Sequence, residues 1–147
     1  MIGPATPRRN AGRLVREDRD WRAGVRPRVL VVDDDDALAD GLRAALSEEG
    51  YAVATARHGA AALEIISTHE PALLIVDLRM PIMDGRSFIE QYRRVATRPC
   101  PIVVLTAARD GREAAETLGA DAFVAKPFDL GKLTATVKEC LARPRIG

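Results

Sequence analysis

The chain has 147 residues, of which 47% are hydrophobic, 29% charged and only 4% aromatic, and its formal net charge at pH 7 is +1. This length fits one domain with a mainly aliphatic core. A charge so close to zero argues against a protein that coats nucleic acid and against a binder of acidic substrates.

Residues 1–27 differ in composition from the rest of the chain. They contain seven arginines, three acidic residues, three prolines and few large apolar side chains. Such a segment buries too little apolar surface to offset the entropy lost on ordering. We therefore expect residues 1–27 to form a flexible arginine-rich arm, either a solvated tail or an arm that contacts a partner or nucleic acid.

From residue 28 onward, short apolar runs alternate with amphipathic segments. The runs are too short for helices and are apolar on both faces, which is typical of buried parallel strands. The predicted strands are 29–32, 52–56, 73–76, 102–105 and 122–125, and the predicted helices are 37–49, 60–68, 86–95, 112–118 and 130–142. This order predicts an α/β fold, a doubly wound five-stranded parallel sheet with helices on both faces. We assign residues 28–143 to this domain and 144–147 to a C-terminal tail.

Polar residues stand at the carboxyl ends of four predicted strands, the edge at which open α/β sheets bind ligands. These residues are Asp33 and Asp34, Asp77, Thr106 and Lys126. Carboxylates this close repel one another unless a cation neutralises them, and hard oxygen ligands favour Mg²⁺. The metal and Lys126 would together neutralise a phosphoryl group, while Asp77 supplies a carboxylate nucleophile and Thr106 a hydrogen bond. Asp35 or Asp36 is expected to cap the following helix.

Four short motifs, in this order, resemble those of the receiver domains of two-component response regulators. They are Val31-Val32-Asp33-Asp34, Val76-Asp77-Leu78-Arg79-Met80-Pro81 with Asp84-Gly85, Val104-Leu105-Thr106-Ala107, and Lys126-Pro127-Phe128. The resemblance covers about residues 28–143. It implies that Asp77 accepts a phosphoryl group from a histidine kinase or a histidine phosphotransfer protein. It also implies Mg²⁺ ligands at Asp33, Asp34, Asp77 and the backbone carbonyl of Arg79, phosphoryl contacts from Lys126 and Thr106, and a conformational switch at Thr106 and Phe123.

The sequence departs from the family pattern in two places. Thr106 and Lys126 are 20 positions apart, slightly closer than is typical, which implies a shortened fourth helix or a shortened loop before it. Phe123 lacks the hydroxyl of the tyrosine often found at this position, so a switch here would work through burial of the ring alone.

The resemblance implies a signalling switch that acts on a downstream protein, rather than an enzyme. The alternative is a receiver-like module that binds its partner without phosphorylation. Nucleic-acid and membrane contacts are not expected, and a homodimer stays open. The chain has no apolar run of the ~20 residues that a membrane span needs, no secretory signal, and no metal-ligand spacing at Cys100 or Cys140. We expect a cytoplasmic protein. The starting Met1 and the arginine-rich arm favour a stand-alone receiver over a piece of a larger protein.

Overall fold

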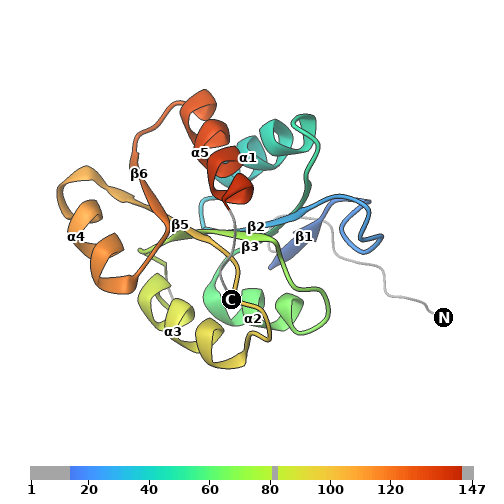
Figure 1. The fold of residues 1–147 in the computed structure, drawn as a ribbon, viewed down its shortest axis with the longest axis horizontal. Helices are drawn as coiled ribbons and strands as arrows, with labels where there is room; N and C mark the ends of the chain where they lie inside the picture. The colour runs from blue at the N-terminus through green and yellow to red at the C-terminus, as the bar shows by residue number, and fades with distance from the viewer. Residues whose placement is uncertain (1–13, 81–82, 144–147) are drawn as a thin grey trace.

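The fold is a six-stranded sheet with helices on both faces (Figure 1). The computed structural model describes residues 14–80 and 83–143. The strands are β1 (Val15–Glu17), β2 (Arg28–Val32), β3 (Ala52–Ala56), β4 (Leu73–Asp77), β5 (Ile102–Ala107) and β6 (Ala122–Lys126), and the helices are α1 (Asp36–Glu48), α2 (Gly59–Ile66), α3 (Gly85–Val95), α4 (Ala108–Leu118) and α5 (Leu130–Ala142). The strand order is β1-β3-β2-β4-β5-β6, and all neighbours are parallel except β1 and β3. The predicted α/β class and doubly wound parallel sheet are confirmed.

The central strands are mostly apolar because each one supplies residues to two separate cores. In β2, Leu30 and Val32 belong to the core on the side of α2 and α3. Val29 and Val31 belong to the core on the side of α1 and α5. Since successive side chains of a strand point to opposite faces, a strand covered on both sides has no position left for an exposed polar residue. This explains why four consecutive residues of β2 have no exposed surface.

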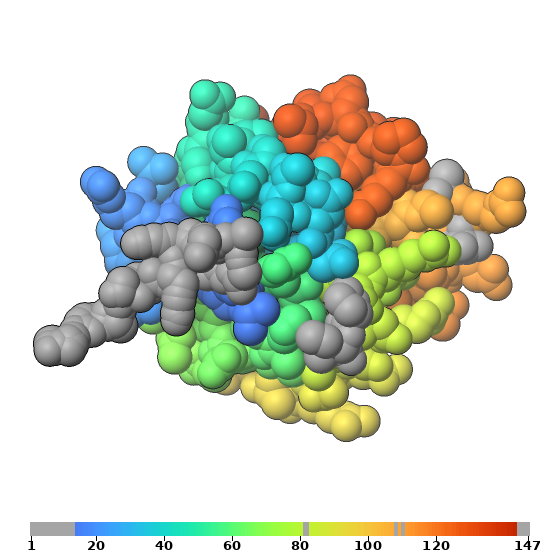
Figure 2. All heavy atoms as spheres, turned by 180° about the vertical axis from the view of Figure 1, so that it is seen from behind, coloured from blue at the N-terminus to red at the C-terminus, as the bar shows by residue number. Residues whose placement is uncertain are grey.

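The sixth strand, β1, comes from the segment that was expected to be flexible. Residues 14–27, called the N-terminal strap from here on, pair β1 antiparallel with β3 and lie beside α1 (Figure 2). The Asp18 carboxylate accepts hydrogen bonds from the Ser47 hydroxyl at 2.7 Å and from the Val53 amide at 2.9 Å. Trp21 is fully buried in the core that faces α2 and α3. The expectation of a flexible arm and of five strands is thus corrected by residues 14–27, while residues 1–13 lie outside the described part.

Helix α4 differs most from its predicted limits, because it begins at Ala108 rather than at residue 112. It follows β5 directly, so the short spacing between Thr106 and Lys126 comes from the loss of a loop. Position 111 within this helix requires glycine, because a Cβ there would collide with the Phe123 ring and with the Thr106 methyl group. Among residues 14–80 and 83–143, no helix has the length and apolar character needed to span a membrane.

Side chains fix the starts of four helices. Asp35, Asp84 and Asp129 cap α1, α3 and α5 by accepting hydrogen bonds from backbone amides of the first turn. The predicted capping role of Asp35 is therefore confirmed. His58 caps α2, since its Nδ1 accepts a hydrogen bond from the Ala61 amide at 3.2 Å. His58 is buried, so this cap is shielded from solvent.

Candidate functional site

The parallel strands bring the predicted polar residues together at the carboxyl edge of the sheet. Asp33 directly follows β2, Asp77 ends β4, and Lys126 ends β6. The Lys126 ammonium lies 3.3 Å from an Asp33 carboxylate oxygen and 3.2 Å from an Asp77 carboxylate oxygen. This cation thus joins two carboxylates from strands that are far apart in the sequence. The expected convergence of strand ends is present.

Burial sets the electrostatics of the site. Asp33 is only 1% exposed, and loss of hydration raises the pKa of its carboxyl to about 6. The charge on Asp77 acts in the same direction, while the Asp35 backbone amide and Lys126 oppose the rise in pKa. Burial lowers the pKa of Lys126, but the two carboxylates together outweigh it, so the net shift of the Lys126 pKa is upward. The site is therefore short of positive charge although a lysine is already present.

Three carboxylates are close enough to share one cation. Oxygen atoms of Asp33, Asp34 and Asp77 all lie within 4.8 Å of one another. Hard oxygen donors suit Mg²⁺, which binds one or two carboxylates directly and keeps several waters. The raised pKa of Asp33 is a second sign of fit, because a divalent cation would relieve the repulsion that disfavours its charged form. Asp36, the last carboxylate of the same run, instead pairs with Arg57 at 3.3 Å.

The remaining predicted residues lie around Asp77. The Arg79 backbone amide donates a hydrogen bond to the Asp77 carboxylate at 3.1 Å, which holds the chain close to the acid. Thr106 is buried in β5, which pairs with β6. Phe123 lies in β6 and is partly buried. Both side chains face Gly111 in α4. The predicted switch pair is thus connected through one glycine, while the metal-ligand role of the Arg79 carbonyl stays a prediction.

Two glycines support the site and were not singled out as functional residues. Gly111 allows α4 to approach Thr106 and Phe123, and Gly85 allows α3 to approach the Asp77 backbone. Gly85 belongs to the Asp84-Gly85 pair that was noted as part of a family motif. The need for close approach could have been suspected only from the position of this glycine at the start of a helix.

Comparison with known proteins agrees with this geometry. A sequence profile of the response regulator receiver domain matches residues 29–138. The chain belongs to this family. Receiver domains are signalling modules of two-component systems, phosphorylated by histidine kinases or phosphotransfer proteins, and are not classical enzymes. The predicted family is confirmed.

Curated relatives of this receiver include the response regulator MprA of two mycobacteria. The Mycobacterium ulcerans protein is 42% identical over 122 residues, which is 81% of this chain and 52% of the relative. The Mycobacterium avium protein is 41% identical over 121 residues, with 80% and 52% covered. The receiver chain thus spans about half the length of the curated relatives it matches. The expectation of a stand-alone protein stays a prediction.

Solved structures of other receivers have the same fold. A two-component response regulator from Clostridium difficile has a TM-score of 0.72 and 28% identity, covering 80% of this chain and 97% of that one. The receiver domain of NtrX from Brucella abortus has a TM-score of 0.72 and 26% identity, covering 79% and 99%. In each case the uncovered part of this receiver is about a fifth of its length.

A methyl group at Gly85 should disturb the site through the backbone. The Cβ of Gly85→Ala would lie 2.7 Å from the Asp77 carbonyl oxygen and 2.7 Å from the Leu78 Cα, neither of which can rotate away. We expect the free energy of unfolding in urea to fall by about 1–3 kcal/mol. Gly41→Ala is the matched control, because its Cβ meets no atom within 4 Å in the middle of α1. It should raise stability by roughly 0.5–1 kcal/mol. Equal urea midpoints for the two variants would contradict this account.

Proposed function

We propose that this receiver accepts a phosphoryl group on Asp77, with Mg²⁺ held by Asp33, Asp34, Asp77 and the backbone carbonyl of Arg79. The donor would be a phosphorylated histidine of a kinase or a phosphotransfer protein. The observation that carries this proposal is the Lys126 ammonium between Asp33 and Asp77, beside three carboxylates whose oxygens lie within 4.8 Å. A partly buried lysine that already contacts the acceptor carboxylate is placed to pair with a phosphoryl oxygen.

The reaction follows from these positions. A carboxylate oxygen of Asp77 attacks phosphorus, a P–O bond forms, and the P–N bond to the donor histidine breaks with the electron pair leaving on the imidazole. When bound, Mg²⁺ neutralises charge on the phosphoryl oxygens. Lys126 supplies a second positive charge from the β6 side. Asp77 needs no general base, because a carboxylate attacks directly as the nucleophile.

The switch would act through Thr106 and Phe123. The Thr106 hydroxyl is buried at the end of β5 and would donate a hydrogen bond to a phosphoryl oxygen. Its methyl group and the Phe123 ring both crowd Gly111, so movement of Thr106 changes the space available to the ring. A two-state shift of this kind changes the affinity for a downstream protein rather than turning over a substrate.

Incubation with a small phosphodonor tests the proposal directly. With Mg²⁺ and acetyl phosphate, intact-mass spectrometry should show one added phosphate per chain. Addition of EDTA should prevent it, because the carboxylates then lack a neutralising cation, and Asp77→Asn should show none. Asp20→Asn, which removes a surface carboxylate from the N-terminal strap, should behave like wild type. No phosphate gain in wild type, matching Asp77→Asn, would instead favour a module that binds its partner without phosphorylation. Equal phosphate gain in wild type and Asp77→Asn would refute Asp77 as the acceptor.

A further inference from the structure

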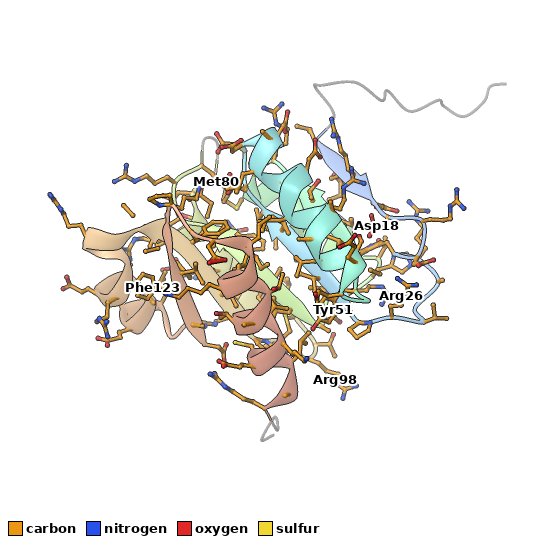
Figure 3. All side chains as sticks on the ribbon, turned by 90° about the horizontal axis from the view of Figure 1, so that it is seen from above. Asp18, Arg26, Tyr51, Met80, Arg98 and Phe123 are labelled. Carbon is orange, nitrogen blue, oxygen red and sulfur yellow. The ribbon has the colours of Figure 1, made fainter. Side chains whose placement is uncertain are left out.

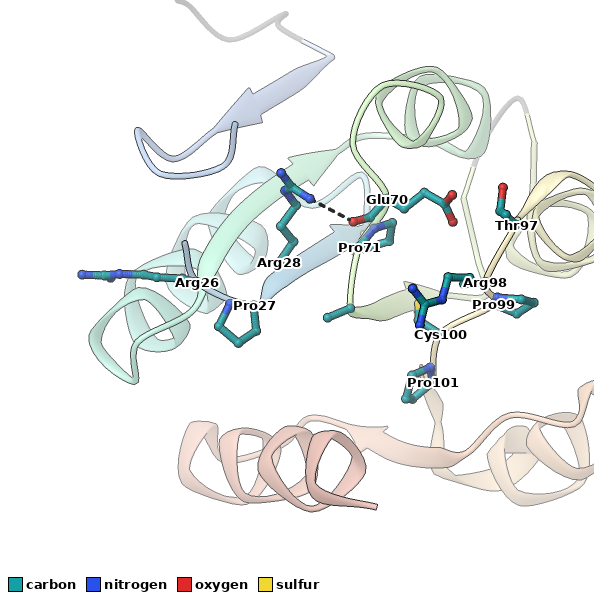
Figure 4. Close-up of a pocket in the computed structure, with 11 residues that line it drawn as sticks. Arg26, Pro27, Arg28, Glu70, Pro71, Thr97, Arg98, Pro99, Cys100 and Pro101 are labelled. Carbon is teal, nitrogen blue, oxygen red and sulfur yellow. Dashed lines mark hydrogen bonds between the residues drawn. The ribbon is translucent and has the colours of Figure 1, made fainter. Parts of the chain in front are cut away.

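A cavity lies at the opposite end of the sheet from Asp77. It has a volume of about 950 Å³ and opens between the segments that lead into β2, β4 and β5 (Figure 4). In Figure 3, Arg26 and Arg98 lie at the other end of the molecule from Met80, which follows the Asp77 strand. We propose that this cavity binds a guanine nucleotide, whose phosphate contacts arginines and whose base contacts Glu70. This inference goes beyond phosphoryl transfer at Asp77 and does not depend on it.

Three arginines give the cavity its positive charge. Arg28 is fixed in position, because its Nε donates to the Trp21 carbonyl at 2.7 Å and its guanidinium lies 5.8 Å from the Trp21 ring centroid. Arg26 is partly neutralised by Asp20 at 3.4 Å. Arg98 is exposed and makes no ion pair or hydrogen bond with any residue that the structure describes. A guanidinium fork matches phosphate oxygens in a bidentate geometry, so Arg98 has its full donor set available for an anion.

Glu70 adds an acceptor to the same cavity. Its side-chain Oε1 is shielded from solvent and has no hydrogen-bond partner among the described residues. A buried carboxylate oxygen without a donor is costly. The Glu70 side chain as a whole is only partly buried and lines the cavity, so its carboxylate is placed to meet a ligand there. The occupant therefore needs N–H donors in addition to a negative charge.

The walls favour a flat, preformed ligand. Four prolines line the cavity, at positions 27, 71, 99 and 101. Proline fixes φ and has no amide hydrogen, so these segments are stiff and offer ring faces in place of amide donors. A cavity of this size lies in the range that holds drug-sized ligands. Inorganic phosphate alone would leave most of this space unfilled.

Guanine fits the acceptor better than adenine does. The guanine base presents two adjacent donors, N1–H and the 2-amino group, and an ionised carboxylate accepts only. Adenine presents an acceptor nitrogen beside its amino group, which a carboxylate repels. A guanine nucleotide therefore supplies the anion for the arginines and the paired donors for Glu70 within one molecule.

Calorimetric titration of the full chain with GMP, AMP, guanosine and inorganic phosphate tests the proposal. GMP should bind saturably below about 1 mM and more tightly than the other three compounds. Arg98→Ala should weaken GMP binding about tenfold or more, because a charge-assisted phosphate contact is lost. Arg112→Ala, which removes an exposed arginine from α4, should leave GMP binding unchanged. Glu70→Gln should bring the affinities for GMP and AMP close together.

Several results would overturn the proposal. These are an absence of saturable GMP binding in wild type, equal affinity for GMP and phosphate, and unchanged GMP binding in Arg98→Ala. A Glu70→Gln variant that keeps the full preference for GMP would refute the contact with the base. Phosphate incorporation on Asp77 should proceed in Arg98→Ala as in wild type. A failure at this cavity would therefore leave the proposed phosphorylation intact, and the reverse also holds.

Discussion

Replacing Trp21 with alanine is expected to lower the free energy of unfolding by about 3–5 kcal/mol. Trp21 is the only tryptophan of the chain and has no exposed surface. It packs into the core that also contains residues of β2, β3 and α2, so its removal leaves a cavity that the surrounding strands cannot easily close. The loss should appear as a lower urea midpoint, followed by circular dichroism because the variant lacks the fluorescent reporter.

Two controls separate burial from other effects of this substitution. Val25 lies in the same N-terminal strap but is 74% exposed, so Val25→Ala should change stability by less than about 0.5 kcal/mol. The indole Nε1 of Trp21 is buried without a partner among the described residues, so Trp21→Phe loses volume but also removes an unsatisfied donor. Trp21→Phe should therefore be much milder than Trp21→Ala. Comparable stability of Trp21→Ala and wild type would show that the strap does not hold the domain together.

Asp33→Asn is expected to stabilise the protein in the absence of metal and to abolish its response to Mg²⁺. Burial raises the pKa of Asp33 from 3.8 to about 6, so the charged form is disfavoured in the folded state at neutral pH. A neutral asparagine of the same shape avoids this cost, and each pKa unit corresponds to about 1.4 kcal/mol. We expect a gain of about 1–3 kcal/mol in urea unfolding at pH 7 with EDTA. Added Mg²⁺ should raise the melting temperature of wild type only.

The pH dependence of stability gives an independent check on Asp33. Because the folded-state pKa lies above the unfolded value, the folded state binds more protons between about pH 4 and 6. The contribution of Asp33 to stability is therefore complete below pH 4 and is lost as the pH rises through 6. Asp33→Asn should remove this part of the slope, whereas Asp36→Asn, which removes a half-exposed carboxylate of the same run, should retain it. An unchanged slope in Asp33→Asn would refute the buried-carboxylate explanation.

The sequence predicts the parallel core well because its signals are local and strong. The strands at 52–56 and 122–125 could be predicted without knowledge of side-chain contacts, since short, mostly apolar runs bounded by turn signals are typical of buried strands. The N-terminal strap was missed for the opposite reason. Its order depends on one tryptophan and on the Asp18 contacts with Ser47 and Val53, which are distant in sequence. A prediction from the average composition of a proline- and arginine-rich segment cannot detect individual contacts of this kind.

The residues that form the site could be predicted from the sequence, but the contacts that support them could not. Strand order alone brings Asp33, Asp77 and Lys126 to one edge, so their meeting follows from topology. The packing of Phe123 against Gly111 depends on how closely α4 approaches β6, and no spacing in the sequence reports that distance. The predicted helix 112–118 misses the first turn of α4, which contains Gly111, and glycine inside a helix weakens its sequence signal.

The pairing of β1 with β3 also has a consequence for contacts between molecules. Without β1, the outer strand on that side would be β3, whose five residues are buried and largely apolar. An exposed strand of this composition is a template for sheet extension by a second chain. The outer strand on this side is instead the three-residue β1, whose central Arg16 forms an ion pair with Asp40 at 3.0 Å. Self-association by strand addition is thereby discouraged on this side, which leaves the five-residue β6 as the longer of the two outer strands.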